Sequence, residues 1–219
     1  AGTALTTGDS NVAVGYAALD AEDTGSNNTA IGNAALSTLN NDAATYNTAV
    51  GSNAGAAVTT GIQNTLIGGL AGDVLTDADY NVAVGVSALG ADTLGSQSTA
   101  IGYSALTNQN FTTATNSVNT AVGYQAGAAV TTGRFNNLFG ALAGDALTTG
   151  EKNIAIGVNA LGSDTTGGRA VAIGQGALTA QNFTGGTANY NVAVGYESGA
   201  AVTTGTENVL IGGLAGDAL

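Results

Sequence analysis

Short apolar segments bounded by asparagine and glycine recur along the whole chain. A representative copy is the segment 119–126, which reads Asn-Thr-Ala-Val-Gly-Tyr-Gln-Ala. The central glycine marks each copy, and it occurs at Gly15, Gly32, Gly51, Gly68, Gly85, Gly102, Gly123, Gly140, Gly157, Gly174, Gly195 and Gly212. Eight of the eleven steps between these glycines are 17 residues long, and the other three are 19 or 21. A short, nearly fixed period predicts a solenoid, in which each repeat, here termed a coil, stacks on the next.

The repeat predicts strands rather than helices. Its core, Asn-x-Ala-(Val/Ile)-Gly, is of strand length and β-branched, and the flanking asparagine and glycine tolerate the left-handed backbone of turns. A helix would lose about 1 kcal/mol at every glycine, and no stretch keeps a 3.6-residue apolar period for long. We therefore expect an all-β, parallel β-roll or β-solenoid of twelve coils of about 17 residues. Each coil should hold a strand, a tight turn, a second strand such as Tyr16–Leu19, and a return loop.

A longer period is superimposed on the short one. Four kinds of coil, exemplified by residues 11–15, 29–32, 55–61 and 66–72, follow one another in fixed order and return after 70 to 72 residues. The resulting super-repeats cover approximately residues 1–70, 71–142 and 143–214, and residues 215–219 begin a fourth. We interpret residues 1–219 as one continuous array without a linker, and as a segment of a longer fibre.

The predicted strand is apolar on both faces. Adjacent residues of a strand point to opposite sides, so Ala13 and Val14 need separate apolar environments. A strand that is apolar on both faces is normally covered on both faces. The second strand of the same coil is one cover, and a neighbouring chain is the other. This pattern favours an oligomer, most simply a homotrimer, although a monomeric solenoid with a broader interior remains an alternative.

Asparagine opens ten of the twelve coils. In stacked coils these side chains come into register about 4.8 Å apart, where they can form a hydrogen-bonded ladder. We expect this structural role rather than a ligand-binding row for Asn11, Asn28, Asn47, Asn64, Asn81, Asn119, Asn136, Asn153, Asn191 and Asn208. Ser98 and Ala170 replace the asparagine in the other two coils.

Inserted residues lengthen the chain between the second and third coils of each super-repeat. Insertions in a solenoid become loops on one face, often the face that binds a partner. The candidate recognition residues are Gln109, Asn110, Phe111, Thr112, Gln181, Asn182, Phe183 and Thr184. For the two phenylalanines, Phe111 and Phe183, the favoured interpretation is that they are flaps that cover the edge of the roll, and contact with a sugar or protein is the alternative.

Composition excludes several classes of function. The net charge of −12 disfavours nucleic acid and anionic membranes as partners, and no apolar run is long enough to cross a bilayer. Histidine and cysteine are absent, and no catalytic constellation is visible, so we expect neither an enzyme nor a cofactor. The acidic clusters around Glu22 and Asp77 lack calcium-binding spacings, which predicts solvated loop charge rather than a metal site. Adjacent threonines, as in Thr59-Thr60-Gly61, predict turns rather than an ice-binding array.

The segment 119–126 resembles the head repeats of trimeric autotransporter adhesins and the repetitive shafts of bacteriophage tail fibres, and the resemblance covers essentially the whole chain. It implies a left-handed parallel β-roll that trimerises side by side. It also implies a structural or adhesive fibre outside the cell, on a cell surface or on a virion, that attaches to a surface receptor or glycan. The alternatives are a solenoid that binds ice or calcium and, less favoured, a fibre-borne enzyme that cleaves carbohydrate.

Overall fold

The computed structural model describes residues 1–219 as a parallel β-solenoid of about twelve coils without helices. Its main strands are three residues long and recur about 17 residues apart, which confirms the predicted all-β fold and period. The chain divides into two compact units. They are Ala1–Ser104 with Asn108–Asn116, and Ala105–Thr107 with Ser117–Leu219. The continuous array, the left-handed sense and the trimer stay predictions.

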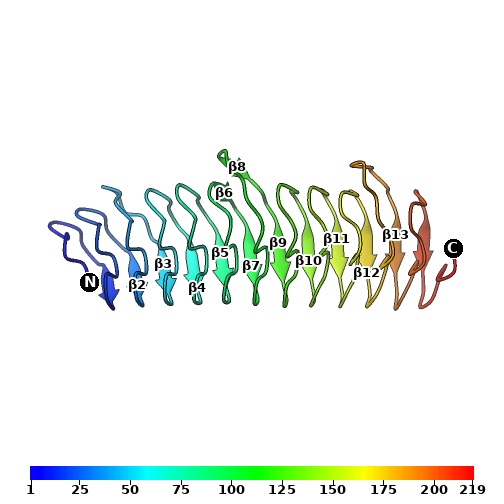
Figure 1. The fold of residues 1–219 in the computed structure, drawn as a ribbon, viewed down its shortest axis with the longest axis horizontal. Coiled ribbons are helices and arrows are strands. Elements are labelled where there is room, and N and C mark those ends of the chain that lie inside the picture. Colours follow the sequence, from blue (N-terminus) through cyan, green and yellow to red (C-terminus); the bar gives the residue numbers. More distant parts are fainter. The chain divides into compact units, whose positions relative to one another are not determined.

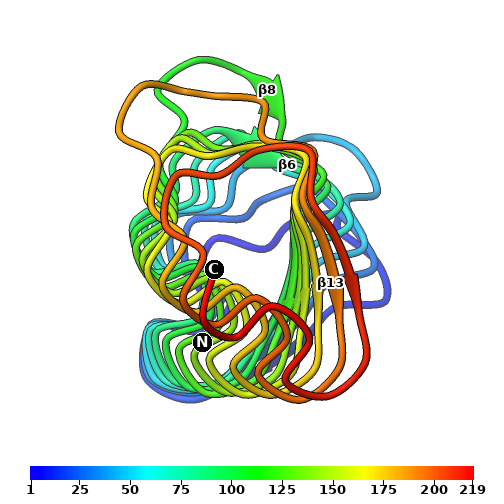
Figure 2. The same ribbon diagram turned by 90° about the vertical axis from the view of Figure 1, so that its right-hand side faces the viewer.

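In the first unit, six main strands pair in parallel and in chain order (Figure 1). They are β1 (Val12–Val14), β2 (Thr29–Ile31), β3 (Thr48–Val50), β4 (Thr65–Ile67), β5 (Val82–Val84) and β7 (Thr99–Ile101). The register aligns the middle residues, so that Ala13 lies opposite Ala30 and Ala30 opposite Ala49. A separate pair, β6 (Gly95–Ser96) and β8 (Thr115–Asn116), lies where the inserted segment projects from this unit (Figure 2).

The second unit repeats this arrangement with six further strands. They are β9 (Thr120–Val122), β10 (Asn137–Phe139), β11 (Ile154–Ile156), β12 (Val171–Ile173), β13 (Val192–Val194) and β14 (Val209–Ile211). Leu138 lies opposite Ala121 on one side and Ala155 on the other. The identical register in both units follows from the sequence period, because a slip by one residue would exchange the inner and outer faces.

The predicted second strand is wrong. The segment after each central glycine forms turns, and in the first coil Ala17 and Leu19 have φ of 50° and 51°. A segment with positive φ at every second residue cannot form an extended strand. The backbone still bonds to the next coil, since Ala34 N donates to Tyr16 O at 2.8 Å and Leu19 N donates to Ala35 O at 3.0 Å. The segment thus gives inter-coil hydrogen bonds without strand geometry.

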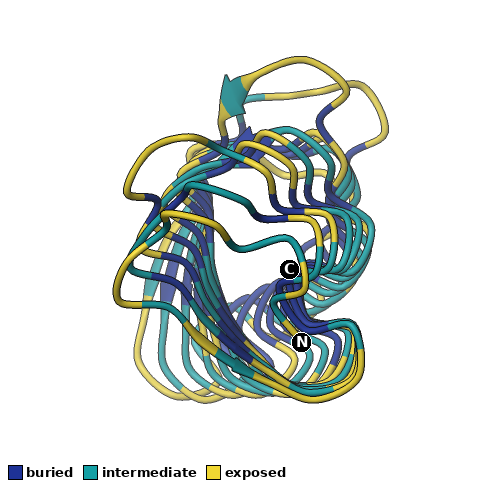
Figure 3. Cartoon of the chain, turned by 90° about the vertical axis from the view of Figure 1, so that its left-hand side faces the viewer, coloured by how far each residue is buried: buried dark blue, intermediate teal, exposed yellow.

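The middle residue of each main strand is less exposed than its neighbours, and it is buried in every strand except β1 and β14; Figure 3 shows the buried segments on the inner side of the coils. Ala30 and Leu66 are fully buried, while the neighbouring Ile31 and Ile67 are 37% and 38% exposed. The inner face is therefore covered by the coil itself. This cover was expected, but it consists of turns rather than of a second strand. On the outer face the third residue of each strand is apolar, whereas the first is threonine or asparagine in half of the strands, and the strongly exposed members of this face have no cover within the chain.

Complementary side-chain volumes account for the fourfold super-repeat. Leu138 replaces the usual alanine at the strand centre, and glycine replaces leucine in the turns around it, at Gly127 and Gly144. A Cβ on Gly127 would lie 2.7 Å from one Leu138 methyl, and one on Gly144 would lie 2.8 Å from the other. Other coils hold leucine at this position with φ near 50°, so space rather than backbone conformation requires glycine here. Large and small residues thus alternate between strand and turn to keep the interior filled.

The central glycine of each coil is required for two reasons. Its φ lies between 126° and 144° in all twelve coils, a region that other residues rarely adopt. A side chain would also collide with the next coil, because a Cβ on Gly68 would lie 2.5 Å from the carbonyl oxygen of Gly85.

We expect Gly68→Ala to lower the free energy of unfolding by about 2 kcal/mol or more, because it combines backbone strain with this collision. Gly69→Ala is the matched control, since the nearest atom to its Cβ would be Ser52 O at 3.9 Å and its φ is ordinary. It should change stability by no more than about 0.5 kcal/mol. Chemical denaturation measures both, and equal effects of the two variants would contradict the account.

Candidate functional site

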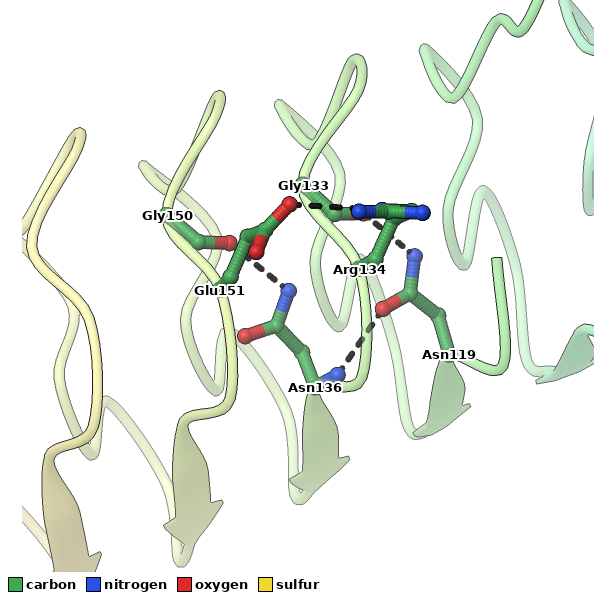
Figure 4. Close-up of polar contacts among 6 residues, drawn as sticks. All are labelled: Asn119, Gly133, Arg134, Asn136, Gly150 and Glu151. Carbon is green, nitrogen blue, oxygen red and sulfur yellow. Dashed lines mark hydrogen bonds and ion pairs between the residues drawn. The ribbon is translucent and has the colours of Figure 1, made fainter. Parts of the chain in front are cut away.

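A row of buried asparagines lies at the start of the strands. In most coils the Nδ2 donates to a backbone carbonyl 14 residues ahead, and the Oδ1 accepts the backbone N–H of the residue 17 ahead. Asn136 makes both bonds, from Nδ2 to Gly150 O at 2.9 Å and from Asn153 N to its Oδ1 at 3.0 Å. Figure 4 shows the preceding step, in which Asn119 contacts Gly133 and Asn136. Each amide therefore bridges two coils.

The asparagine row is chiefly a ladder between side chains and backbone. Direct contacts between amides are few: Asn64 Nδ2 donates to Asn47 Oδ1 at 3.3 Å, and Asn208 Nδ2 donates to Asn191 Oδ1 at 3.1 Å. The backbone bonds matter because a buried polar group without a partner costs about 1–3 kcal/mol. The row therefore has a structural role, and its side chains are not exposed to a ligand.

The inserted segments are only partly available to a partner. Of the eight candidate recognition residues, Asn110, Thr112, Asn182 and Thr184 are exposed, whereas Gln109, Phe111, Gln181 and Phe183 are buried. The second set is corrected from recognition residues to core residues, because these residues bond to the buried carboxylates of Asp92 and Asp164 at the base of the insertion. Recognition by the exposed set stays a prediction.

A buried carboxylate holds the third inserted segment in place. Asp164 Oδ1 accepts the backbone N–H groups of Gly167 at 2.9 Å and Phe183 at 3.1 Å. Its Oδ2 accepts Gln181 Nε2 at 2.7 Å, and Gln181 Oε1 accepts Asn191 Nδ2 at 2.7 Å. The network joins Asp164 and Gly167 of one coil to Gln181 and Phe183 of the next coil and to Asn191 of the coil after the insertion, so it fixes the base of the loop.

A glutamine compensates where the ladder asparagine is missing. The corresponding pairs in the three super-repeats are Asn28 with Leu39, Ser98 with Gln109, and Ala170 with Gln181. The insertion displaces the carbonyl that the asparagine would normally reach, and Asn28 Nδ2 finds only Ser26 O at 3.3 Å. In the second super-repeat, Gln109 Nε2 donates to Ser98 Oγ at 2.8 Å instead. A shorter residue in the ladder therefore coincides with a longer polar residue later in the same coil.

The expectation of solvated charge in the cluster around Glu22 is wrong for Glu22 itself. Glu22, Asp92 and Asp164 occupy the same position in the three super-repeats and are fully buried. Burial raises the pKa of Asp92, while hydrogen bonds from Gln109 and from the backbone of Phe111 and Gly95 lower it in part. Their recurrence three residues before a glycine was the signal in the sequence that could have identified them.

The remaining acidic clusters offer no metal site. No group of three or more acidic, histidine or cysteine residues is arranged to hold an ion. Asp77 Oδ1 accepts Thr60 Oγ1 at 2.6 Å, and Asp79 Oδ1 accepts Ile62 N–H at 2.8 Å. Burial raises the pKa of Asp73. These acids and the threonines of the Thr-Thr-Gly segments thus make hydrogen bonds between neighbouring coils, and the absence of enzymatic activity stays a prediction.

One ion pair is present, between Arg134 Nε and Glu151 Oε1 at 3.3 Å (Figure 4). Both side chains are partly exposed, so the pair contributes at most about 1 kcal/mol to stability. It nevertheless joins two neighbouring coils at the base of the return loops.

The chain matches no model of a protein family and no curated protein. None of its elements is a helix of the length and apolarity that crossing a bilayer requires. The resemblance to adhesin heads and phage fibres therefore remains an expectation from the repeat motif.

The compensating glutamine can be tested directly. Gln181→Leu should lower the free energy of unfolding by about 2 kcal/mol or more, because it leaves a buried oxygen of Asp164 without its donor. Leucine itself fits this position, as Leu39 shows in the first super-repeat. Gln175→Leu, on an exposed residue of the same coil, should be nearly neutral. Thermal or chemical melts in which Gln181→Leu is as stable as this control would refute the proposed role.

Proposed function

We propose that the chain is a shaft segment of a structural or adhesive fibre on a cell surface or virion, formed by copies that pack side by side. The observation that supports this function best is the outer face of the main strands. Its third position is apolar in every coil: Val14, Ile31, Val50, Ile67, Val84 and Ile101 in the first unit, and Val122, Phe139, Ile156, Ile173, Val194 and Ile211 in the second.

These side chains form a regular row within each unit. In the second unit, Phe139 lies opposite Val122 and Ile156 in the strand register, and Phe139 and Ile156 are each 39% exposed. Soluble monomers rarely expose contiguous apolar patches larger than a few hundred Å². A second copy is the occupant that fits a row repeated at the strand spacing, because an identical chain offers the same spacing in return.

A homotrimer is the proposed assembly. Closed cyclic symmetry covers the apolar row on every copy with equivalent contacts, and the resemblance to adhesin heads implies three chains. The acidic charge of −12 per chain would then lie on the outside and limit association between fibres. Location outside the cell and attachment to a receptor or glycan belong to the same proposal, and the calcium-binding alternative finds no set of ligands.

Ile156→Asp tests the proposed interface. It should convert the assembly to monomers while the isolated chain keeps its strand signal, because Ile156 points outward and a charge there is costly only when another chain covers it. Ala155→Asp is the control, since Ala155 is fully buried and a charge there should prevent folding altogether. Native mass spectrometry and circular dichroism report the two properties. A wild-type chain that is monomeric at all accessible concentrations would overturn the proposal.

A further inference from the structure

All three basic side chains of this acidic chain lie on consecutive coils of the second unit. Arg134, Lys152 and Arg169 are its only lysine and arginine residues, against 15 aspartates and glutamates. The backbone N–H of Lys152 donates to Arg134 O, and that of Arg169 donates to Glu151 O, both at 3.0 Å. Lys152 and Arg169 therefore occupy the same position of adjacent coils, about 4.8 Å apart along the stack. The basic residues of the chain are therefore gathered on three neighbouring coils.

A hollow of about 190 Å³ lies beside these two cations. Its lining includes Lys152, Arg169, Glu151, Thr149, Thr166 and Gly186. Gly186 belongs to the third inserted segment, and its N–H donates to Thr166 Oγ1 at 3.0 Å, which holds this wall against the coil. Pockets that enclose drug-sized ligands measure about 300–1,000 Å³, so this hollow suits a smaller group such as one sugar residue.

The two cations have no acidic partner within the chain. The one ion pair uses Arg134, whereas Lys152 and Arg169 contact aromatic rings. Lys152 Nζ lies 5.9 Å from the ring centre of Phe135, and Arg169 Cζ lies 5.5 Å from that of Tyr190. Both rings are substantially exposed. The hollow is thus bordered by two unpaired cations, with an exposed ring beside each of them.

We propose that this hollow binds a carboxylate-bearing sugar residue of an acidic polysaccharide. The guanidinium of Arg169 presents a planar pair of donors that matches a carboxylate, and Lys152 adds a second charge. Glu151 and Thr149 can bond to sugar hydroxyls, and the exposed rings of Phe135 and Tyr190 offer apolar faces for the ring carbons. This site specifies the surface glycan of the proposed fibre function and rests on that function.

The lining favours a sugar acid over a bare anion such as phosphate. Glu151 lines the hollow and carries a negative charge, which opposes a dianion more strongly than a single carboxylate. A carboxylate oxygen of Glu151 can instead accept a hydrogen bond from a hydroxyl group. A sugar supplies such hydroxyl groups, and inorganic phosphate at neutral pH supplies fewer of them. The overall negative charge of the chain also repels anionic polymers, so binding should depend on this local site and should weaken with added salt.

Calorimetric titration of the full chain with a galacturonic acid oligomer tests the proposal. We expect a dissociation constant of about 1 mM or tighter, and at least about tenfold weaker binding of the galactose oligomer that lacks the carboxylates. Arg169→Gln and Lys152→Gln should each weaken binding about tenfold. Both side chains are exposed, so neither variant should impair folding.

Gln63→Glu is the control for net charge. It changes the charge by the same amount as Arg169→Gln and lies at the equivalent, exposed position of a coil in the first unit. It should leave binding within about twofold of the wild type. An equal loss in this variant would mean non-specific electrostatics and would overturn the proposal. Equal binding of the neutral oligomer, full competition by millimolar inorganic phosphate, or no binding of the acidic oligomer at millimolar concentration would also overturn it.

Tyr190→Ala distinguishes a sugar site from a pair of cations alone. The ring should add binding by stacking, so its removal should weaken binding several-fold while phosphate binding, if any, stays unchanged. If this variant binds the acidic oligomer as tightly as the wild type, the ring of Tyr190 does not contact the sugar. Failure of the sugar site can be distinguished from failure of the fibre proposal, because native mass spectrometry reports assembly of the chains whether or not the oligomer binds.

Discussion

The hydrogen bond from a buried asparagine side chain to the backbone of the next coil is the interaction on which this fold most depends. Each coil has only three residues of regular strand, so most of its interior backbone groups cannot be paired by a sheet. Asn136 pairs two such groups of the next coil. Its Nδ2 donates to Gly150 O, and its Oδ1 accepts the N–H of Asn153.

Glycine and the insertions follow from the same constraint. The coil closes only if the chain reverses next to a neighbouring carbonyl, which leaves no space for a side chain at Gly68. Where inserted residues lengthen a coil, the asparagine loses its usual acceptor, and a different network replaces it. Asp164 and Gln181 make that replacement in the third super-repeat. The buried charge is tolerated because every oxygen of the carboxylate accepts a hydrogen bond.

The period, the strands and the structural asparagines could be predicted from the sequence, because each depends on local residue types that recur in register. The turns could not, since Ala17 and Leu19 adopt left-handed conformations that neither residue favours by itself. Stacking with the next coil imposes that conformation. The burial of Gln109 was also missed, because polar residues in an insertion normally indicate an exposed loop. The basic hollow was missed because its two cations, Lys152 and Arg169, are separated in the sequence and meet only through stacking.

Exchange of side-chain amide hydrogens, followed by nuclear magnetic resonance, tests the central role of the asparagine ladder most directly. The Nδ2 hydrogens of Asn136 and Asn153 are buried and bonded to Gly150 and Gly167. They should exchange only when the coils separate, and therefore orders of magnitude more slowly than those of the exposed Asn182. Equally fast exchange at Asn136, Asn153 and Asn182 would show that the ladder does not hold the coils together, and would contradict the account.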